Sequence, residues 1–415
     1  MKNPGALGEC LEPVTADEPA PRAEVVCYTD PVEGWQGWLA VCGDGHRLAA
    51  GGLRMQPGVS ESTVVHLAEA MWLKQRLLGL AVDGAKAGMD RDPDLPGKGE
   101  ALCRFLGFLR PHLMDGLSLG PDVNMTWTEL EESARRVGIP SAKFAVARTQ
   151  GLDENDFGAR LRLLDVDVDG ATMAERRAGH ALAAATLEAI EAAGISGRRD
   201  VRIGIQGFGT MGRAAAMSLT ESGLTPTSVT DAHTCLNVHE EDGVTVPDAL
   251  PPQRLTDLSL DVLVLAACED AITLERAAHL DLSAVVVGAN LGLAPEVEDL
   301  LHRRGVLVVP DFVGGCGGSA SVDAIFGPPR CPTPAQVLDS LGLRVRALVR
   351  EMFELSRDRG ITPRQAALLM TRRKVPPGKP YGTVGRITPA SAGTQNGGGT
   401  TDDGPAGVSV TKDDV

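Results

Sequence analysis

A glycine-rich hexapeptide, Gly207-Phe208-Gly209-Thr210-Met211-Gly212, most constrains what this chain can fold into. It follows an apolar run at residues 201–205 and precedes a helix-forming run at 214–217. In a strand–turn–helix unit of this kind, Gly207 permits the tight turn, Gly209 lets a pyrophosphate approach the backbone, and Gly212 allows helix and strand to pack closely. The helix N terminus then offers unpaired N–H groups to phosphates. The hexapeptide therefore predicts a Rossmann-type dinucleotide-binding unit rather than a glycine turn without a ligand.

The pattern from residue 200 to 312 favours the same fold. Short apolar runs alternate with helix-length segments, which is typical of a parallel sheet covered on both faces. The predicted strands are residues 201–205, 228–230, 262–265, 284–287 and 306–309. Asp231 ends the second strand, at the spacing expected for a carboxylate that binds the adenosine ribose hydroxyls. Because a carboxylate there repels a 2′-phosphate, the sequence favours NAD over NADP.

Two lysines and an aspartate stand out in the first half. Residues 64–78 have an apolar period near 3.6 and predict a helix, with Lys74 on its apolar stripe. A lysine there either extends to water or holds an anion in a partly dry site. The small residues on both sides of Lys86 predict a tight loop that approaches a ligand closely. Lys86 is a candidate base if a second cation and desolvation lower its pKa, and Asp122 is then a candidate proton shuttle.

Composition narrows the class of protein. The chain has 415 residues and a formal net charge of −15, which disfavours nucleic acid or an anionic membrane as the main partner. No apolar run approaches the ~18 residues needed to span a bilayer, and the first 23 residues contain no apolar signal core. The eight cysteines and eight histidines are dispersed, without the spacing of a disulfide scaffold or a metal site. These features predict a cytoplasmic globular protein without a metal.

Further sequence blocks occur in order along the chain. They are Gly51-Gly52-Leu53-Arg54-Met55, Lys74, Gly84-Ala85-Lys86-Ala87-Gly88, Gly120-Pro121-Asp122-Val123-Asn124, the hexapeptide at 207–212, Gly288-Ala289-Asn290, and Pro310-Asp311-Phe312 with Gly317-Gly318. Together these blocks resemble the amino-acid dehydrogenases of the glutamate, leucine, phenylalanine and valine group, most of all the leucine and phenylalanine branch. The resemblance runs from about residue 25 to 373. It implies reversible oxidative deamination of an L-amino acid to a 2-oxo acid and ammonia, with a nicotinamide cofactor.

The resemblance also implies roles for individual residues. Lys74 resembles the lysine that binds the substrate α-carboxylate, Lys86 the lysine that activates water, and Asp122 the aspartate that exchanges protons with the amino group. Asn290 resembles the asparagine beside the nicotinamide ribose and the substrate. The remaining residues implied to bind substrate are Gly51, Gly52, Met71 and Val322, and those implied to contact the cofactor are Thr172, Ala266 and Ala267.

The substrate side chain is predicted from two positions. Glutamate-specific members of the family place a lysine immediately before the first Gly-Gly, where this chain has Ala50, and tend to carry a hydroxyl where it has Val322. Loss of both partners would leave a substrate γ-carboxylate unpaired, so the sequence favours an apolar side chain of the leucine, valine or phenylalanine type. Ser319 keeps a polar side chain open, so glutamate or a modified amino acid is an alternative. A non-catalytic NAD-binding paralogue is a second alternative, disfavoured because Lys74, Lys86 and Asp122 are all present.

The resemblance implies an α/β architecture in which a substrate and oligomerisation domain precedes the Rossmann-type domain, in a homo-oligomer. The expected parts are a flexible tail at 1–23, the substrate domain at 24–170, the NAD-binding domain at 171–335, closing helices at 336–375 and a disordered tail at 376–415. Within them, a helix from 99 is expected to stop at Pro111. The acidic stretch at 150–170 is expected to be a flexible excursion.

Overall fold

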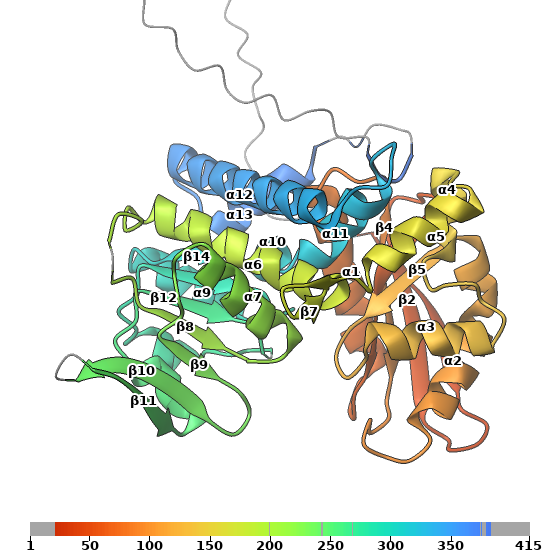
Figure 1. Ribbon diagram of the computed structural model, residues 1–415, viewed down its shortest axis with the longest axis horizontal. Coiled ribbons are helices and arrows are strands. Elements are labelled where there is room, and N and C mark those ends of the chain that lie inside the picture. Colours follow the sequence, from red (N-terminus) through yellow and green to blue (C-terminus); the bar gives the residue numbers. More distant parts are fainter. Residues whose placement is uncertain are drawn as a thin grey trace, which may run out of the picture. The chain divides into compact units, whose positions relative to one another are not determined.

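The computed structural model of the chain describes residues 21–373 with gaps at 199, 242–243 and 268, together with 375 and 379–382. The first half contains a five-stranded sheet in the order β1-β2-β4-β3-β5 (Figure 1). Its strands are β1 (Glu24–Thr29), β2 (Gln36–Cys42), β3 (Ala49–Met55), β4 (Asp83–Met89) and β5 (Leu117–Pro121). Strands β4, β3 and β5 are parallel, whereas each pairing that includes β1 or β2 is antiparallel. The prediction of an α/β first domain is confirmed.

Different helices cover the two faces of this sheet. The helices of this half are α1 (Glu61–Leu77), α2 (Lys98–Asp115), α3 (Trp127–Arg136), α4 (Phe144–Gln150) and α5 (Glu154–Leu163). A Cβ on Gly84 of β4 would lie 2.2 Å from the α1 backbone, so α1 packs directly on the strand. Ala85 and Ala87 point to the other face and join a core cluster with α2 and α3. Because side chains alternate along a strand, Lys86 lies on the α1 face.

The second sheet has seven strands in the order β11-β10-β9-β8-β12-β13-β14. They are β8 (Ile203–Gln206), β9 (Ser228–Thr230), β10 (Cys235–Glu241), β11 (Val244–Leu250), β12 (Val262–Leu265), β13 (Ala284–Val287) and β14 (Leu307–Val309). The five strands from β9 to β14 in this order are parallel and coincide with the predicted strands to within two residues, which confirms the Rossmann-type fold. The hairpin of β10 and β11 at one edge was not predicted.

Helices pack on both faces of the second sheet. They are α6 (Met173–Ala192), α7 (Thr210–Glu221), α8 (Leu274–Ala277), α9 (Pro295–Arg303), α10 (Asp311–Gly314) and α11 (Gly317–Phe326), with a 3-10 helix η1 (Pro252–Asp257). On β12, Val262 and Val264 join the core cluster that contains α6, whereas Leu263 and Leu265 join the cluster that contains α9. This double burial explains why the strands are continuous apolar runs.

The closing helices are α12 (Pro334–Arg359) and α13 (Pro363–Thr371), and α12 lies across α6 and α11 (Figure 1). They return to the first half. Arg76 Nε at the end of α1 donates to the Thr371 carbonyl at 3.1 Å, and Arg344 donates to the Leu78 carbonyl. Among the described residues, every helix is too short or too polar to cross a bilayer.

Two local predictions are wrong. Helix α2 continues through Pro111 to Asp115, because Leu109 and Leu113 on either side of the proline are buried in the same core. That burial outweighs the one backbone hydrogen bond that a proline removes. The acidic stretch at 150–170 is ordered as α5 and a small hairpin of β6 (Asp167–Val168) and β7 (Ala171–Thr172). Its acids include Asp153, which caps α5 by accepting the Asp156 N–H at 2.8 Å.

The predicted tails fall largely outside the described residues, which begin at 21 and end at 382. Within the predicted C-terminal tail, however, Tyr381 is buried. Its backbone N–H donates to Gln150 Oε1 at 3.2 Å, and Gln150 Nε2 donates back to its carbonyl at 3.3 Å. Disorder is therefore the wrong description of residues 379–382.

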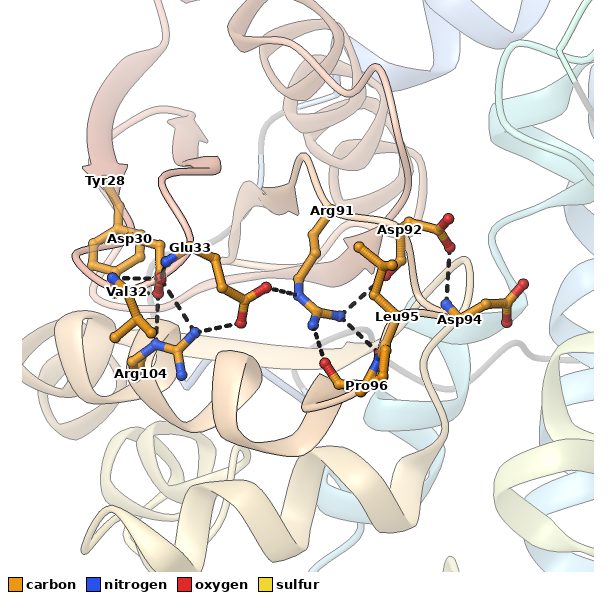
Figure 2. A network of polar contacts seen from close by, with 10 residues as sticks. All are labelled: Tyr28, Asp30, Val32, Glu33, Arg91, Asp92, Asp94, Leu95, Pro96 and Arg104. Atoms are coloured by element: carbon orange, nitrogen blue, oxygen red, sulfur yellow. Dashed lines mark hydrogen bonds and ion pairs between the residues drawn. The ribbon is translucent and has the colours of Figure 1, made fainter.

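A polar network ties the β1–β2 turn to α2, as Figure 2 shows. The buried Asp30 carboxylate accepts the backbone N–H groups of the turn and the Arg104 Nε at 2.7 Å. Glu33 bridges Arg104 and Arg91, and Arg91 in turn donates to three backbone carbonyls between residues 92 and 96. Burial alone would raise the pKa of Asp30, but hydrogen bonds from Arg104 and from the turn outweigh it and lower the pKa to about 2.

Replacement of Arg104 should destabilise the first half. Arg104→Met leaves the Asp30 carboxylate buried without its cation, so the free energy of unfolding at pH 7 should fall by about 1–3 kcal/mol in urea denaturation. The folded pKa of Asp30 lies below its ordinary value of 3.8, so the stabilisation is present above pH 4 and is lost as the pH falls towards 2. The difference between variant and wild type should therefore narrow on acidification.

Arg136→Met is the matched control, because Arg136 and its partner Glu100 are both exposed. Its effect should stay below about 0.5 kcal/mol. Equal effects of the two substitutions would show that the buried network contributes nothing specific.

Candidate active site

One face of the first sheet carries the predicted catalytic residues. In the strand register, Lys86 on β4 pairs with Gly52 on β3, which pairs with Gly120 on β5. Residues of one such row point to the same face, here the face that α1 covers. Asp122 follows β5 and reaches the same place. A Cβ on Gly52 would lie 3.0 Å from Asp122 Cβ and 3.3 Å from Lys86 Nζ, so the glycine leaves space beside both.

Lys86 lies in a central strand and not in a loop, so that part of the prediction is wrong. Its neighbours are small because α1 packs closely on β4, not because the chain turns there. The Lys86 side chain is 2% exposed, and its Nζ lies 2.7 Å from Asp122 Oδ2. Burial lowers the pKa of Lys86 to about 8; Asp122 opposes this fall and Arg54 adds to it. Lys86 is therefore a candidate base, as predicted.

Arg54 is a candidate site residue that the sequence prediction missed. Its Nε donates to Asp122 Oδ2 at 2.8 Å, the oxygen that also contacts Lys86. Burial would raise the pKa of Asp122, but Lys86 and Arg54 hold it well below its usual range. The signal was present in the sequence, because Arg54 follows Gly52 by two residues in a strand and so shares its face.

Lys74 joins the two halves of the site. It is 4% exposed, and its Nζ donates to Asn290 Oδ1 at 2.5 Å. Burial lowers the pKa of Lys74. The partner Asn290 follows β13, and its loop is held by Asp311, which accepts the Leu291 N–H at 2.9 Å and pairs with Arg364 at 2.8 Å. Of the two alternatives for Lys74, the structure therefore supports a dry polar site.

The other predicted substrate residues are spread around this place. Met71 is half-buried on α1, one turn before Lys74. Val322 of α11 is buried in the same core cluster as Ala50. Gly51 faces away from the site, because it pairs with Ala85 of the opposite face. A Cβ on Gly51 would lie 1.5 Å from the Ala85 carbonyl, so the close approach of the two strands requires the glycine.

The hexapeptide has the geometry that its glycines predict. Gly207 has φ of +95°, and a Cβ there would lie 2.7 Å from the backbone of Ala266 and Ala267. A Cβ on Gly212 would lie 1.8 Å from the Gly207 carbonyl, so α7 packs directly against the turn. Gly209 instead faces open space at the N terminus of α7, which no side chain caps. These features fit a dinucleotide phosphate lying against Gly209.

The remaining cofactor candidates lie around this turn. Phe208 and Met211 are half-buried, whereas Thr210 is exposed. Asp231 follows β9 as predicted, and its exposed carboxylate accepts the N–H groups of His233 and Thr234 at 2.7 and 2.8 Å. Thr172 lies at the N terminus of α6, where its hydroxyl exchanges hydrogen bonds with Glu175. This cap explains Thr172 without a ligand, so its contact with a cofactor stays a prediction.

One group in the described part of the chain has the spacing of metal ligands, namely Asp44, His46 and Asp83, whose ligand atoms lie within 4.8 Å of one another. The Asp83 carboxylate already accepts backbone N–H groups from Asp44, Gly45 and His46 at 2.9 to 3.1 Å. These hydrogen bonds explain the cluster as a means of holding the β2–β3 loop.

Two parts of the chain match the descriptions of one family. Residues 22–138 match "Glu/Leu/Phe/Val dehydrogenase, dimerisation domain", and residues 246–375 match "Glutamate/Leucine/Phenylalanine/Valine dehydrogenase". The chain belongs to the Glu/Leu/Phe/Val dehydrogenase family. The first range holds both lysines and Asp122 of the site, and the second holds Asn290. Residues 139–245, with the hexapeptide and α6, lie between the two matched ranges.

The similar proteins of this family include glutamate dehydrogenases. The chain is 27% identical over 296 residues to the glutamate dehydrogenase of Thermotoga maritima, a match that covers 65% of this chain and 67% of that protein. It is also 27% identical over 295 residues to the NADP-specific glutamate dehydrogenase of Saccharolobus shibatae, with 65% of each chain covered. The matched part thus spans about two thirds of these relatives' length.

A solved structure with the same fold is the hetero-hexameric glutamate dehydrogenase of Thermus thermophilus in a leucine-bound form. The TM-score is 0.68 at 25% identity, with 85% of this chain and 87% of that chain covered. The coverage extends the likeness to both sheets.

The glycines of the hexapeptide should differ in their tolerance of a side chain. Gly212→Ala places a methyl group against the Gly207 carbonyl and should lower the free energy of unfolding by roughly 2–4 kcal/mol. Gly209→Ala is the matched control, because its φ of −76° suits alanine and its Cβ would meet nothing within 4 Å. It should cost less than about 1 kcal/mol. Urea denaturation measures both, and equal losses would contradict the packing of α7 on the turn.

Proposed function

We propose that this family member is an NAD-dependent L-amino-acid dehydrogenase, which oxidatively deaminates its substrate to a 2-oxo acid and ammonia in a reversible reaction. The observation that carries the proposal is the grouping of Lys86 and Asp122 on the sheet face that α1 covers, with the buried Lys74 of α1 bonded to Asn290 of the second sheet. A non-catalytic paralogue would have no need to keep two cations desolvated there. Perturbed ionisable groups gathered next to a nucleotide-binding turn are typical of an active site.

Lys74 is the proposed partner of the substrate α-carboxylate. Its nearest hydrogen-bond partner is the neutral amide of Asn290, so the ammonium has donors to spare for an anion. Burial makes that pairing strong, because an ion pair formed in a dry site is not screened by water. Asn290 then orients the ammonium towards the second sheet, where the cofactor is expected.

Lys86 and Asp122 are the proposed proton-transfer pair. With a pKa of about 8, Lys86 is neutral in a large fraction of molecules at mildly alkaline pH, and its free amine can remove a proton from an attacking water. Asp122 stays a carboxylate because two cations hold it, so it can accept a hydrogen bond from the substrate amino group and relay its proton. Arg54 positions Asp122 and keeps the site positively charged.

The proposed cofactor is NAD, which would accept the hydride from the substrate α-carbon. The residues proposed to hold it are the hexapeptide at 207–212, Asp231, Ala266 and Ala267, with Thr172 and Asn290 nearer the substrate. Asp231 supports NAD, because its exposed carboxylate at the end of β9 would repel a 2′-phosphate. The NADP-specific name of one relative makes NADP the alternative.

The side chain of the substrate has two candidate classes. Ala50 and Val322 are buried and apolar, which supports the leucine, valine or phenylalanine type that the sequence predicts. The glutamate dehydrogenases among the relatives support an acidic side chain. The polar Ser319 keeps a modified amino acid as a variant of the second class. The classes differ by a charge at the end of the side chain, so the position of buried cations decides between them.

We also propose a cytoplasmic homo-oligomer assembled through the first domain. The match of residues 22–138 to a dimerisation domain and the hetero-hexameric form of the Thermus thermophilus glutamate dehydrogenase support oligomerisation. The net charge of −15 suits a soluble metabolic enzyme.

The reaction can be tested by following NADH absorbance with each common L-amino acid at alkaline pH. Lys86→Met should lower kcat about 1000-fold, because it removes the base without adding a charge. Binding of NADH, measured by its fluorescence, should be unchanged. If the protein binds the cofactor but none of the amino acids gives NADH, the result would favour the non-catalytic paralogue.

The pH profile gives a second readout of the same lysine. Since protonated Lys86 cannot act as a base, kcat/KM should be lost as the pH falls through about 8 and reach a plateau above it. Asp122 raises the pKa of Lys86, so Asp122→Asn should move the profile to lower pH as well as lower the rate. A flat profile from pH 6 to 9 would contradict the role of Lys86.

The cofactor preference should depend on Asp231. Asp231→Asn removes the charge but keeps the oxygen that accepts the turn N–H groups, so the fold should be preserved. The ratio of kcat/KM for NAD over NADP should fall by about 10-fold or more, because the repulsion of the 2′-phosphate is lost. Asp281→Asn, at another exposed position, should leave the ratio unchanged. An NADP preference in the wild type would contradict this interpretation of Asp231.

A further inference from the structure

Besides Lys74, two buried cations have no carboxylate partner among the described residues. Lys143, which precedes α4, is 4% exposed, and Arg177 of α6 is 8% exposed. Within the described residues, Lys143 Nζ donates to one acceptor, Ser118 Oγ at 3.2 Å. Arg177 donates to Ser321 Oγ at 2.7 Å and to the carbonyls of Gly318 and Ala174 at 3.3 Å. Neither is within ion-pair distance of a described carboxylate, which is costly for a buried charge.

Lys143 lies on the face of the sheet that holds the catalytic residues. Its partner Ser118 is on β5, two residues before Gly120, and therefore points to the same face. The Lys143 Nζ lies 3.6 Å from where a Cβ on Gly120 would be. Gly120 pairs with Gly52, and Gly52 pairs with Lys86. The ammonium groups of Lys86 and Lys143 thus lie at opposite ends of a row. The residues between them in this row, Gly52 and Gly120, have no side chain.

The dimensions of this row suit an amino acid. Neighbouring strands lie about 4.8 Å apart, so a substrate centred over Gly52 has Lys86 on one side and Gly120, with Lys143, on the other. The distance from one strand to the next is within the reach of an extended amino-acid side chain. A substrate whose α-carbon lies near Lys86 and Asp122 therefore directs its side chain towards Lys143.

Arg177 of α6 contacts α11, the helix that carries the other predicted side-chain residue, Val322. Its partners Gly318 and Ser321 are on α11, where Val322 also lies. On the same helix, Ser319 accepts a hydrogen bond from Gln75, the neighbour of Lys74, at 3.2 Å. The Oε1 atom of Gln75 is buried without a partner among the described residues. The helix that carries the apolar Val322 therefore also carries polar groups, and it contacts the buried cation Arg177.

We propose that Lys143 and Arg177 bind the anionic end of the substrate side chain, so that the enzyme acts on L-amino acids whose side chain ends in a carboxylate. This inference rests on the proposed dehydrogenase function and names its substrate class. The cation missing at Ala50 is supplied by two other elements, α6 and the residue before α4. The proposed acidic substrate class replaces the apolar substrate side chain that Ala50 and Val322 alone predict.

The electrostatics of the pair agree with this arrangement. Burial, together with the nearby charge of Arg177, lowers the pKa of Lys143 to about 7. Burial also lowers the pKa of Arg177 to about 10. A carboxylate bound between them would remove the mutual repulsion and restore the charge of Lys143. Glu131, the carboxylate that acts on Lys143 from a distance, is itself engaged by Ser141 and the Ala142 N–H.

The test compares acidic amino acids with neutral ones of similar length. The kcat/KM for L-glutamate, L-2-aminoadipate and L-aspartate should be measured with NAD beside L-glutamine, L-norleucine and L-methionine. The best acid should exceed every neutral amino acid by about 100-fold or more. Lys143→Met should reduce that ratio by about 100-fold, mainly through KM, because binding of the distal anion is lost. Lys98→Met, whose ammonium pairs with Glu129 on the α3 side, is the matched control and should leave the ratio unchanged.

A binding measurement on the wild type keeps the inference testable if Lys143→Met does not fold. Calorimetry in the presence of NADH should show glutarate binding about 100-fold tighter than pentanoate, its analogue with one carboxylate. Equal binding of the two, or turnover of neutral amino acids above the acids, would overturn the inference and leave the dehydrogenase function intact. Tight glutarate binding without NADH formation from any amino acid would overturn the function instead.

Discussion

The candidate active site depends on the ion pairs that the Asp122 carboxylate forms with two cations. It contacts the buried cations Lys86 and Arg54 at 2.7 and 2.8 Å and so lowers the repulsion between them, while 18% of its own side chain stays exposed. The rest of this sheet face makes room for the group: Gly52 lies beside it, and α1 packs on the same face at Gly84. Removal of the carboxylate would leave Lys86 unpaired and Arg54 with Glu269 alone, at 3.5 Å, which costs more than the hydrogen bonds alone.

The candidate active site also depends on the contact between the two sheets. Lys74 belongs to a helix on the first sheet, whereas Asn290 follows a strand of the second, and their hydrogen bond joins the proposed sites of substrate and nucleotide. Asp311 and Arg364 hold the Asn290 loop from behind. Helix α13 also contacts the end of α1, through the hydrogen bond from Arg76 to the Thr371 carbonyl, and so supports the same link. The residues proposed to bind substrate and cofactor are thus held in one packed unit.

Local rules predicted most of the second half. The hexapeptide and the apolar strands could be read from the sequence, because a tight strand–helix turn and double burial each leave a short signature. The same rules failed around Lys86. Its small neighbours are typical of a loop, but they lie in a strand and allow a helix to pack closely on it. The prediction that a helix ends at Pro111 failed for a related reason, because burial of Leu109 and Leu113 outweighs the lost hydrogen bond. Lys143 carried no recognisable signal, because its significance comes from contacts between distant segments.

The row of Gly52 and Gly120 has a consequence for how specificity could change. At the proposed substrate site these two glycines offer main chain alone, so they cannot discriminate among side chains, and we expect residues around the site to determine which amino acid is accepted. The proposed contacts, Lys143 before α4, Arg177 of α6 and Val322 of α11, come from separate stretches of the chain. A new substrate range can therefore arise by exchanging residues at these positions while the proton-transfer machinery stays untouched.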